Sequence, residues 1–260
     1  MSTIDTLGAS SPDAIGPDAI GPDAIVLVAM AEEAAPFLAA AGTAAGQPVT
    51  VGKALQYRLT LAGREVLLVQ GGIGLANAAG AATSAILAAR AGDPLAAPLV
   101  ISAGSAGGVG IEVRVGEVVI GSECLNSDAD ARPFGYVLGQ VPGMPARYDG
   151  AAAALDAAES PTRMPDGSAV IVQRGLMVSN DKFVGAELAE SLRVLFPGVL
   201  STDMESVAIA QTCFAYGVPF VAIRGISDLC GPVGDHLTHV DDAAERSAVV
   251  VLETLRQLAR

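Results

Sequence analysis

The sequence predicts an α/β protein, with a three-layer α/β/α arrangement and a mixed central sheet. Short apolar segments typical of buried strands alternate along most of the chain with segments of helical periodicity. Two strand-like segments flank Ala62-Gly63, which is a hairpin signal, and two more lie on either side of Gly110. Some neighbouring strands must therefore be antiparallel, within a sheet that helices cover on both faces.

Turn and capping residues set the expected bounds of these elements. A buried strand at residues 25–30 leads into a helix that Gly42 is expected to end. The hairpin strands, 49–61 and 65–70, precede an alanine-rich helix that extends to about residue 91. Further strands are expected at 98–103, 113–120, 169–177 and 218–226, and further helices are expected to end near residues 196, 217 and 260.

The N-terminal residues have a different composition from the rest of the chain. Residues 11–25 read S-P-D-A-I-G-P-D-A-I-G-P-D-A-I, which is one five-residue unit in three copies. A proline in every unit prevents a helix, and the unit has too little apolar surface to fold alone. We therefore expect residues 1–23 to be a disordered tail and residues 24–260 to form a single domain.

Composition and charge exclude several classes of partner. The chain has 260 residues, of which 51% are hydrophobic, and a net charge of -13. The negative charge argues against nucleic acid as a partner, because phosphates would be repelled. No apolar run approaches the ~18 residues of a membrane span. The three cysteines have no paired spacing, which indicates a reducing compartment, the cytoplasm.

The stretch from residue 199 to 231 reads as a strand end, a helix and a second strand. Residues 201–203 are all N-cap types, and the apolar run that Met204 opens covers most of a helix circumference. We therefore expect a buried helix, which Gly217 and Pro219 end.

Two carboxylates stand at the ends of these buried elements. Glu205 lies in the first helical turn, and Asp228 follows the apolar strand 218–226. Either one alone would be a helix cap or a turn residue. Because ligands of open α/β sheets gather at the carboxyl ends of strands, the pair favours a ligand site. Glu32 and Glu33 also follow a buried strand; a first helical turn favours such acids for its dipole alone.

Three other patterns suggest a dinucleotide site, a P-loop and a metal site, but each lacks a feature that such a site requires. The run Gly71-Gly72-Ile73-Gly74 lacks the third glycine of a dinucleotide fingerprint, since Asn77 stands there. The stretch 104–108, which contains Ser105, Ala106 and Gly107, lets a ligand approach the backbone, but no lysine follows it as in a P-loop. The acids and histidines at 235–242 are better explained by a capping box of Thr238 and Asp241 than by a metal site. We expect no metal and no cofactor.

Several segments, in order along the chain from residue 25 onward, resemble one known family. They are A-M-A-E-E (29–33), G-G-I-G (71–74), A-G-S-A-G-G (103–108), V-G-E-V-V-I (115–120), D-A-D-A-R-P-F-G-Y-V-L-G-Q-V-P-G (128–143), G-L-M-V-S-N-D-K-F-V (175–184), D-M-E-S-V-A-I-A (203–210) and R-G-I-S-D (224–228). The family is that of the 5′-methylthioadenosine/S-adenosylhomocysteine nucleosidases, in the nucleoside phosphorylase/hydrolase superfamily.

The resemblance implies a catalytic domain that hydrolyses the bond between adenine and ribose in a nucleoside, without a cofactor. Such a bond breaks through an oxocarbenium-like transition state, so the enzyme must protonate the leaving base and present water to the sugar. By resemblance Asp228 is the acid that protonates adenine, and Glu33 positions and deprotonates water. Glu205 holds the ribose hydroxyls, with Met204 beneath the sugar.

The remaining implied contacts surround the base and the 5′ substituent. By resemblance Phe183 stacks on adenine, the backbone of Val184 reads its edge, Ile73 lines the 5′-alkylthio pocket, and Ser105 lies near the water and the ribose. The chain departs from the family pattern at Asp203, which is usually one methylene longer. It departs again where Asn180 and Lys182 replace the two small residues of S-G-D-A-F. The family also implies a homodimer, in which the loop 127–148 reaches the neighbouring site.

Three alternatives remain from the sequence. The same residues would serve release of adenine from 6-amino-6-deoxyfutalosine. A nucleoside phosphorylase would need cations for phosphate, whereas the relevant positions hold Glu32-Glu33 and Ile101-Ser102. A nucleoside-binding protein without activity could share the fold, although joint retention of Glu33, Glu205 and Asp228 argues against it.

Overall fold

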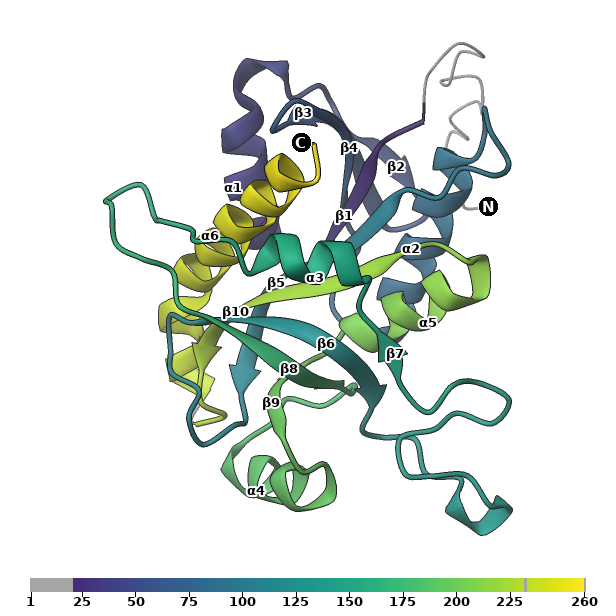
Figure 1. The fold of residues 1–260 in the computed structure, drawn as a ribbon, viewed down its shortest axis with the longest axis vertical. Helices are drawn as coiled ribbons and strands as arrows, with labels where there is room; N and C mark the ends of the chain where they lie inside the picture. Colours follow the sequence, from purple (N-terminus) through teal and green to yellow (C-terminus); the bar gives the residue numbers. More distant parts are fainter. Residues whose placement is uncertain (1–20, 232, 260) are drawn as a thin grey trace, which may run out of the picture.

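The computed structural model describes residues 21–231 and 233–259, and it confirms the predicted three-layer α/β/α class with a mixed sheet (Figure 1). The strands are β1 (Ala24–Val28), β2 (Val49–Val51), β3 (Ala54–Leu61), β4 (Arg64–Gln70), β5 (Leu99–Gly108), β6 (Val118–Asn126), β7 (Tyr148–Asp149), β8 (Val172–Ser179), β9 (Val199–Asp203) and β10 (Phe220–Asp228). The helices are α1 (Ala31–Ala41), α2 (Leu75–Ala89), α3 (Ala152–Ala158), α4 (Ala186–Leu195), α5 (Ser206–Tyr216) and α6 (Val233–Gln257), with short 3-10 turns η2 (Gly42–Ala44) and η3 (Arg132–Phe134).

The strands form one sheet in the order β10-β6-β8-β9-β5-β1-β4-β3-β2, with β7 paired to β6. The long strand β5 bonds β1 and β10 in parallel and then β9 antiparallel at its end. Because β10 also bonds β6, the strands β10, β6, β8, β9 and β5 close into a ring, from which β1, β4, β3 and β2 extend as an open sheet. This closure brings the carboxyl ends of several strands to one place.

Alternate residues of β1 face the two helical layers, as side chains of a strand must. Ile25 and Leu27 pack in a cluster with α2 and α5. Val26 and Val28 pack instead with Phe37 of α1 and with α3 and α6. Figure 1 shows α1 and α6 on one side of the sheet and α2 and α5 on the other.

Glycine and turn residues end the elements where the sequence predicts. Gly42 follows α1 at φ 61 and Gly217 follows α5 at φ 63, a region that favours glycine. Ala62 and Gly63 both have positive φ, 53 and 76, as a two-residue hairpin turn between β3 and β4 requires.

Three strand predictions are wrong in their bounds. The strand predicted at 98–103 continues through the stretch 104–108, which is the end of β5, because Gly107 and Gly108 pair with Thr202 and Ser201 of β9. The strand predicted at 113–120 begins only at Val118 and continues to Asn126, since turns occupy the residues before it. The predicted strand 49–61 is divided into β2 and β3 by a turn. The short helix α3 had no sequence prediction.

The helix predictions need three corrections. Residues 201–203 belong to β9, and α5 begins at Ser206 with Glu205 as its N-cap. The helix is also less buried than its apolar residues suggest, because Phe214 is 56% exposed. The capping box of Thr238 and Asp241 is wrong, since α6 begins at Val233 and both residues lie inside it.

The N-terminal part of the chain meets the domain at Asp23. Most of the predicted tail, residues 1–20, lies outside the described residues. Asp23 exchanges hydrogen bonds with Glu65, through its backbone N–H (2.8 Å) and its side chain (3.0 Å), next to the start of β1. In the described part of the chain, no helix combines the length and apolar content that crossing a membrane would need.

Candidate active site

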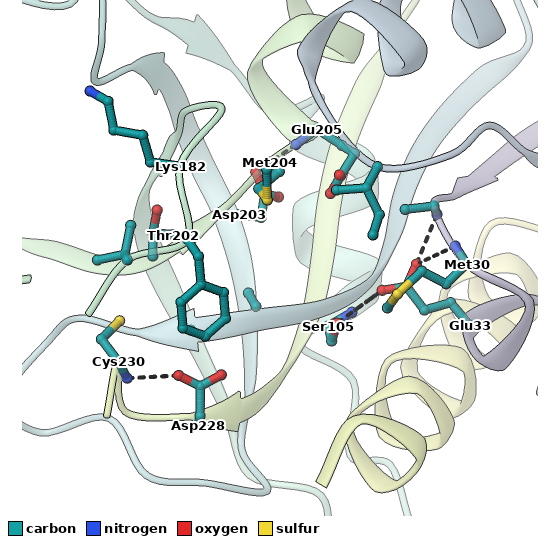
Figure 2. A pocket seen from close by; sticks show the side chains of 16 residues that line it. Met30, Glu33, Ser105, Lys182, Thr202, Asp203, Met204, Glu205, Asp228 and Cys230 are labelled. Carbon is teal, nitrogen blue, oxygen red and sulfur yellow. Dashed lines mark hydrogen bonds between the residues drawn. The ribbon is translucent and has the colours of Figure 1, made fainter. Parts of the chain in front are cut away.

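A cavity of about 150 Å³ opens at the carboxyl ends of β1, β5, β8, β9 and β10 (Figure 2). This is where ligands of α/β sheets are expected to bind. All the site residues named from the sequence line it: Glu33, Ile73, Ser105, Ala106, Gly107, Phe183, Val184, Asp203, Met204, Glu205 and Asp228. Segments that are far apart in the sequence therefore contribute to one site.

Glu33 is buried at one side of the cavity, and protein donors hold both of its carboxylate oxygens. Oε2 accepts hydrogen bonds from the backbone N–H groups of Ala29 (2.8 Å) and Met30 (3.2 Å), at the start of α1. Oε1 accepts from the backbone N–H (2.8 Å) and the hydroxyl (3.0 Å) of Ser105. These four bonds fix the orientation of the carboxyl group.

Gly104 makes this placement of Glu33 possible. It has φ 128, which strongly favours glycine. A Cβ on Gly104 would lie 2.4 Å from Cδ and Oε1 of Glu33, and 2.7 Å from Nη1 of Arg224. The strand can therefore carry no side chain at this position without displacing the carboxylate.

Arg224 lies beneath the cavity in β10 and is the centre of a buried ionic cluster. Its guanidinium contacts Asp203 (Nε to Oδ2, 2.9 Å), Glu205 (Nη2 to Oε2, 2.8 Å) and Glu33 (Nη1 to Oε1, 3.9 Å). Nη1 also donates to the carbonyl of Ala103 at 2.7 Å. One cation thus serves three carboxylates, which disfavours full ionisation of the cluster.

The excess of carboxylates over cations in this cluster affects the pKa of Glu205. Burial raises the pKa of Glu205 to about 7; the charge of Arg224 lowers it, and the charges of Asp203 and Glu33 raise it. Its Oε1 accepts the backbone N–H of Gly74 at 3.0 Å, in the loop before α2. The side chain therefore changes charge near neutral pH while facing the cavity.

Asp203 is surrounded by protein donors. Oδ1 accepts from the hydroxyl of Ser179 (2.5 Å) and from the backbone N–H groups of Glu205 (3.2 Å) and Ser206 (3.1 Å). Oδ2 accepts from Arg224 Nε at 2.9 Å and from the Ser206 hydroxyl. Asp203 lines the cavity, but its bonds mainly hold β8, β9 and the start of α5 in register.

Asp228 lies at the end of β10, on the opposite side of the cavity from Glu33, and Ser105 stands between them (Figure 2). Its Oδ1 accepts the backbone N–H of Cys230 at 2.8 Å, and Oδ2 accepts the hydroxyl of Ser227 at 2.9 Å. Cys230 has a positive φ of 58, which is uncommon for a residue other than glycine. Burial raises the pKa of the Cys230 thiol to about 12, so the sulfur is no nucleophile at neutral pH.

Sequence reasoning missed four residues of the site and overlooked the role of one more. Ala29, Met30, Thr202 and Cys230 line the cavity, and Arg224 supports it from below. A signal for Arg224 existed, because an arginine inside an apolar strand buried on both faces must be paired. Among the described residues, no group of acids, histidines and cysteines could hold a metal ion.

Comparison with known proteins identifies the family. A model described as the Phosphorylase superfamily matches residues 23–256. A nucleosidase of Listeria innocua, named 5′-methylthioadenosine/S-adenosylhomocysteine nucleosidase, is 37% identical over 219 residues, which cover 82% of this chain and 90% of the relative. The chain belongs to the 5′-methylthioadenosine/S-adenosylhomocysteine nucleosidase family of the phosphorylase superfamily.

Solved structures of this nucleosidase family share the fold. The enzyme of Neisseria meningitidis, in complex with methylthio-immucillin-A, matches with a TM-score of 0.79 at 35% identity, over 90% of this chain and 98% of its own. The enzyme of Colwellia psychrerythraea, in complex with adenine, matches with a TM-score of 0.83 at 30% identity, over 92% of this chain and 96% of its own.

Proposed function

We propose that this chain hydrolyses the N-ribosidic bond of 5′-methylthioadenosine and S-adenosylhomocysteine, releasing adenine and the 5′-thio-substituted ribose. The observation that carries the proposal is that Glu33, Glu205 and Asp228 line one cavity, with a single buried guanidinium committed to two of them. The nucleosidase relatives support the choice of substrate class.

Glu33 is the base that activates water in this proposal. Its Oε1 already bonds the hydroxyl of Ser105, which can rotate to accept or donate. A water placed between Ser105 and the sugar could donate one proton to Glu33 Oε1 while its lone pair attacks the anomeric carbon. The four donors on Glu33 keep the carboxylate in place for that proton transfer.

Asp228 is the acid for the leaving base. Protonation of an adenine ring nitrogen makes the base a neutral leaving group, which lowers the barrier to an oxocarbenium-like transition state. The bonds from Ser227 and Cys230 direct the carboxyl toward the cavity across from Glu33. The proton donor and the water base are thus on opposite sides of the proposed sugar position.

The remaining residues hold the nucleoside. Glu205 is proposed to accept hydrogen bonds from the ribose hydroxyls, with Met204 beneath the sugar. Phe183 and Val184 are proposed to hold the base, and Ile73 to line the pocket of the 5′ substituent. The wall of the cavity is completed by Asp203, Ala106 and Gly107. Asp203 is proposed to support Glu205, because its carboxylate accepts the backbone N–H of Glu205.

A phosphorylase is the alternative that the geometry disfavours. Phosphate would have to bind beside the anomeric carbon, where the buried carboxyl group of Glu33 lies. Among the described residues that line the cavity, Lys182 is the only cationic one, and its ammonium is paired with Asp128 at 2.5 Å. The relatives named as nucleosidases agree with water as the acceptor.

We also propose a homodimer of a single catalytic domain, residues 24–260, in the cytoplasm. The loop 127–148 exposes Phe134 (83%) and Val137 (55%), apolar side chains that a second copy could cover. A groove of about 490 Å³ lies between α2 and α5, and Met144 of the same loop is among the residues that line it. Three free, buried cysteines fit a reducing compartment.

An adenine-release assay tests the proposal. The wild-type protein should release adenine from 5′-methylthioadenosine, from S-adenosylhomocysteine, or from both, faster than from 6-amino-6-deoxyfutalosine. Asp228→Asn should lower turnover by roughly 10²–10⁴ while nucleoside binding persists. A protein that binds the nucleoside without releasing adenine would be a binding protein, and a preference for the futalosine derivative would move the substrate assignment to that compound.

A further inference from the structure

The segment that carries the proposed base contacts is a loop, residues 180–184 between β8 and α4. Val184 is buried in the cluster under α4, so the end of the loop is fixed by packing. Phe183 is 47% exposed and lines the cavity, so packing alone fixes its position less firmly. The backbone just before Phe183 therefore contributes to the position of its ring.

Asn180 is a buried polar side chain that joins three parts of the chain. Its Nδ2 donates to the hydroxyls of Ser127 (3.2 Å) and Thr202 (3.3 Å), and its Oδ1 accepts the backbone N–H of Lys182 (2.9 Å). The last bond folds the loop back on itself next to Phe183. A glycine or alanine at this position could make none of these side-chain bonds.

Lys182 connects the same loop to Asp128 on the surface of the protein. Its Nζ lies 2.5 Å from Oδ1 of Asp128, and Figure 2 shows the ammonium pointing away from the carboxylates of the cavity. The neighbouring residue Ser127 donates its backbone N–H to the carbonyl of Ser179 at 3.0 Å, so residues 127–128 are tied to the loop at both ends. Asp181 makes a separate tie, to the N–H of Leu75 at 2.8 Å.

We propose that Asn180 and Lys182 are positioning residues for nucleoside affinity, which act on Phe183 through Ser127 and Asp128. Neither is proposed to react with the substrate. The inference rests on the proposed function, because it assigns the loop to the base. It also connects the base site to the loop 127–148, since Asp128 stands at the start of that segment.

The expected changes in KM depend on how buried the interactions of Lys182 and of Asn180 are. An ion pair as exposed as Lys182 and Asp128 is weak, so Lys182→Ala should raise the KM about two- to fivefold. Asn180→Ala leaves buried groups with fewer partners and should raise the KM roughly tenfold or more. Because a less populated binding conformation lowers affinity without altering the chemical groups, kcat should change less than about threefold.

The experiment has two readouts on the full chain. The first is amide hydrogen exchange of residues 179–185 in the free protein, which needs no activity. The second is the KM and kcat of adenine release from 5′-methylthioadenosine. Lys182→Asp and Asp128→Lys, each alone and then combined, supply the rescue test. Arg256→Ala breaks an ion pair of similar exposure (3.0 Å to Glu253) in α6 and is the matched control.

The proposal predicts faster exchange and a raised KM in both single charge variants, partial recovery of both in the double variant, and wild-type values in Arg256→Ala. Unchanged exchange in Lys182→Ala and Asn180→Ala would overturn the positioning role, whether or not the protein has activity. Faster exchange with an unchanged KM would overturn the link to substrate. Failure of the wild-type protein to release adenine would instead contradict the proposed function.

Discussion

Removal of the Arg224 charge should destabilise the protein more than any surface substitution. Arg224→Met keeps most of the apolar stem but leaves Asp203, Glu205 and Glu33 buried without their common cation. Breaking a buried pair from one side costs about 3–5 kcal/mol of the free energy of unfolding, because the remaining charge is uncompensated. In a chain of this size that corresponds to a fall in Tm of roughly 6–20 °C.

The same substitution should make stability depend more steeply on pH. In the native protein the pKa of Glu205 is raised above its unfolded value, so its favourable contribution is present at low pH and is lost as pH rises through about 7. Arg224 lowers that pKa, so its removal raises it further. The deficit of Arg224→Met relative to wild type should therefore be larger at pH 8 than at pH 5.5.

Chemical denaturation at these two pH values, with thermal melting alongside, measures both effects. Arg174→Met is the matched control, because Arg174 is a partly exposed arginine that also meets two carboxylates, Asp156 (3.3 Å) and Glu159 (3.4 Å). It should change stability by less than about 1 kcal/mol. An Arg224→Met protein within 1 kcal/mol of wild type, or a deficit that shrinks as pH rises, would refute the account of the cluster.

Two further predictions concern the same site. The KM for 5′-methylthioadenosine should fall as pH rises from about 6 to 8, because the ribose hydroxyls donate hydrogen bonds to ionised Glu205. Glu205→Gln should raise the KM roughly 10–100-fold and remove this dependence on pH. A KM of the wild-type protein that does not change with pH would contradict the role of Glu205. Gly104→Ala should displace Glu33 and lower kcat by about 10² or more. Gly198→Ala, at φ 84 with open space around it, should cost stability only, and equal kcat losses in both glycine variants would count against the steric argument.

Local sequence patterns predicted most of the fold because strand burial and helix ends are local properties. The apolar runs that became β1 and β10, and the glycines that end α1 and α5, needed no distant partner. Closure of the sheet could not be predicted in this way. It depends on the pairing of Gly107 and Gly108 with β9, and glycines carry no side-chain pattern that distinguishes a strand from a loop.

For the site too, local sequence patterns predicted some residues and could not predict others. The carboxylates at strand ends, Glu33, Glu205 and Asp228, were visible because charge beside an apolar strand requires an explanation. The ties of Asn180 and Lys182 to Ser127 and Asp128 join segments about fifty residues apart, so no local spacing signals them. The exposure of Phe214 was missed for a similar reason, since helix periodicity cannot show which apolar residues the rest of the chain leaves uncovered.

Product analysis in phosphate buffer tests most directly whether water is the acceptor. The account predicts that 5′-methylthioadenosine yields adenine and the free 5′-methylthioribose, at the same rate with and without phosphate. Glu33→Gln should abolish most of this turnover with little change in nucleoside affinity, because the base is removed while the shape remains. If the main sugar product were instead the 1-phosphate, formed at a rate that rises with phosphate concentration, Glu33 could not be the base that activates water and the hydrolase account would be contradicted.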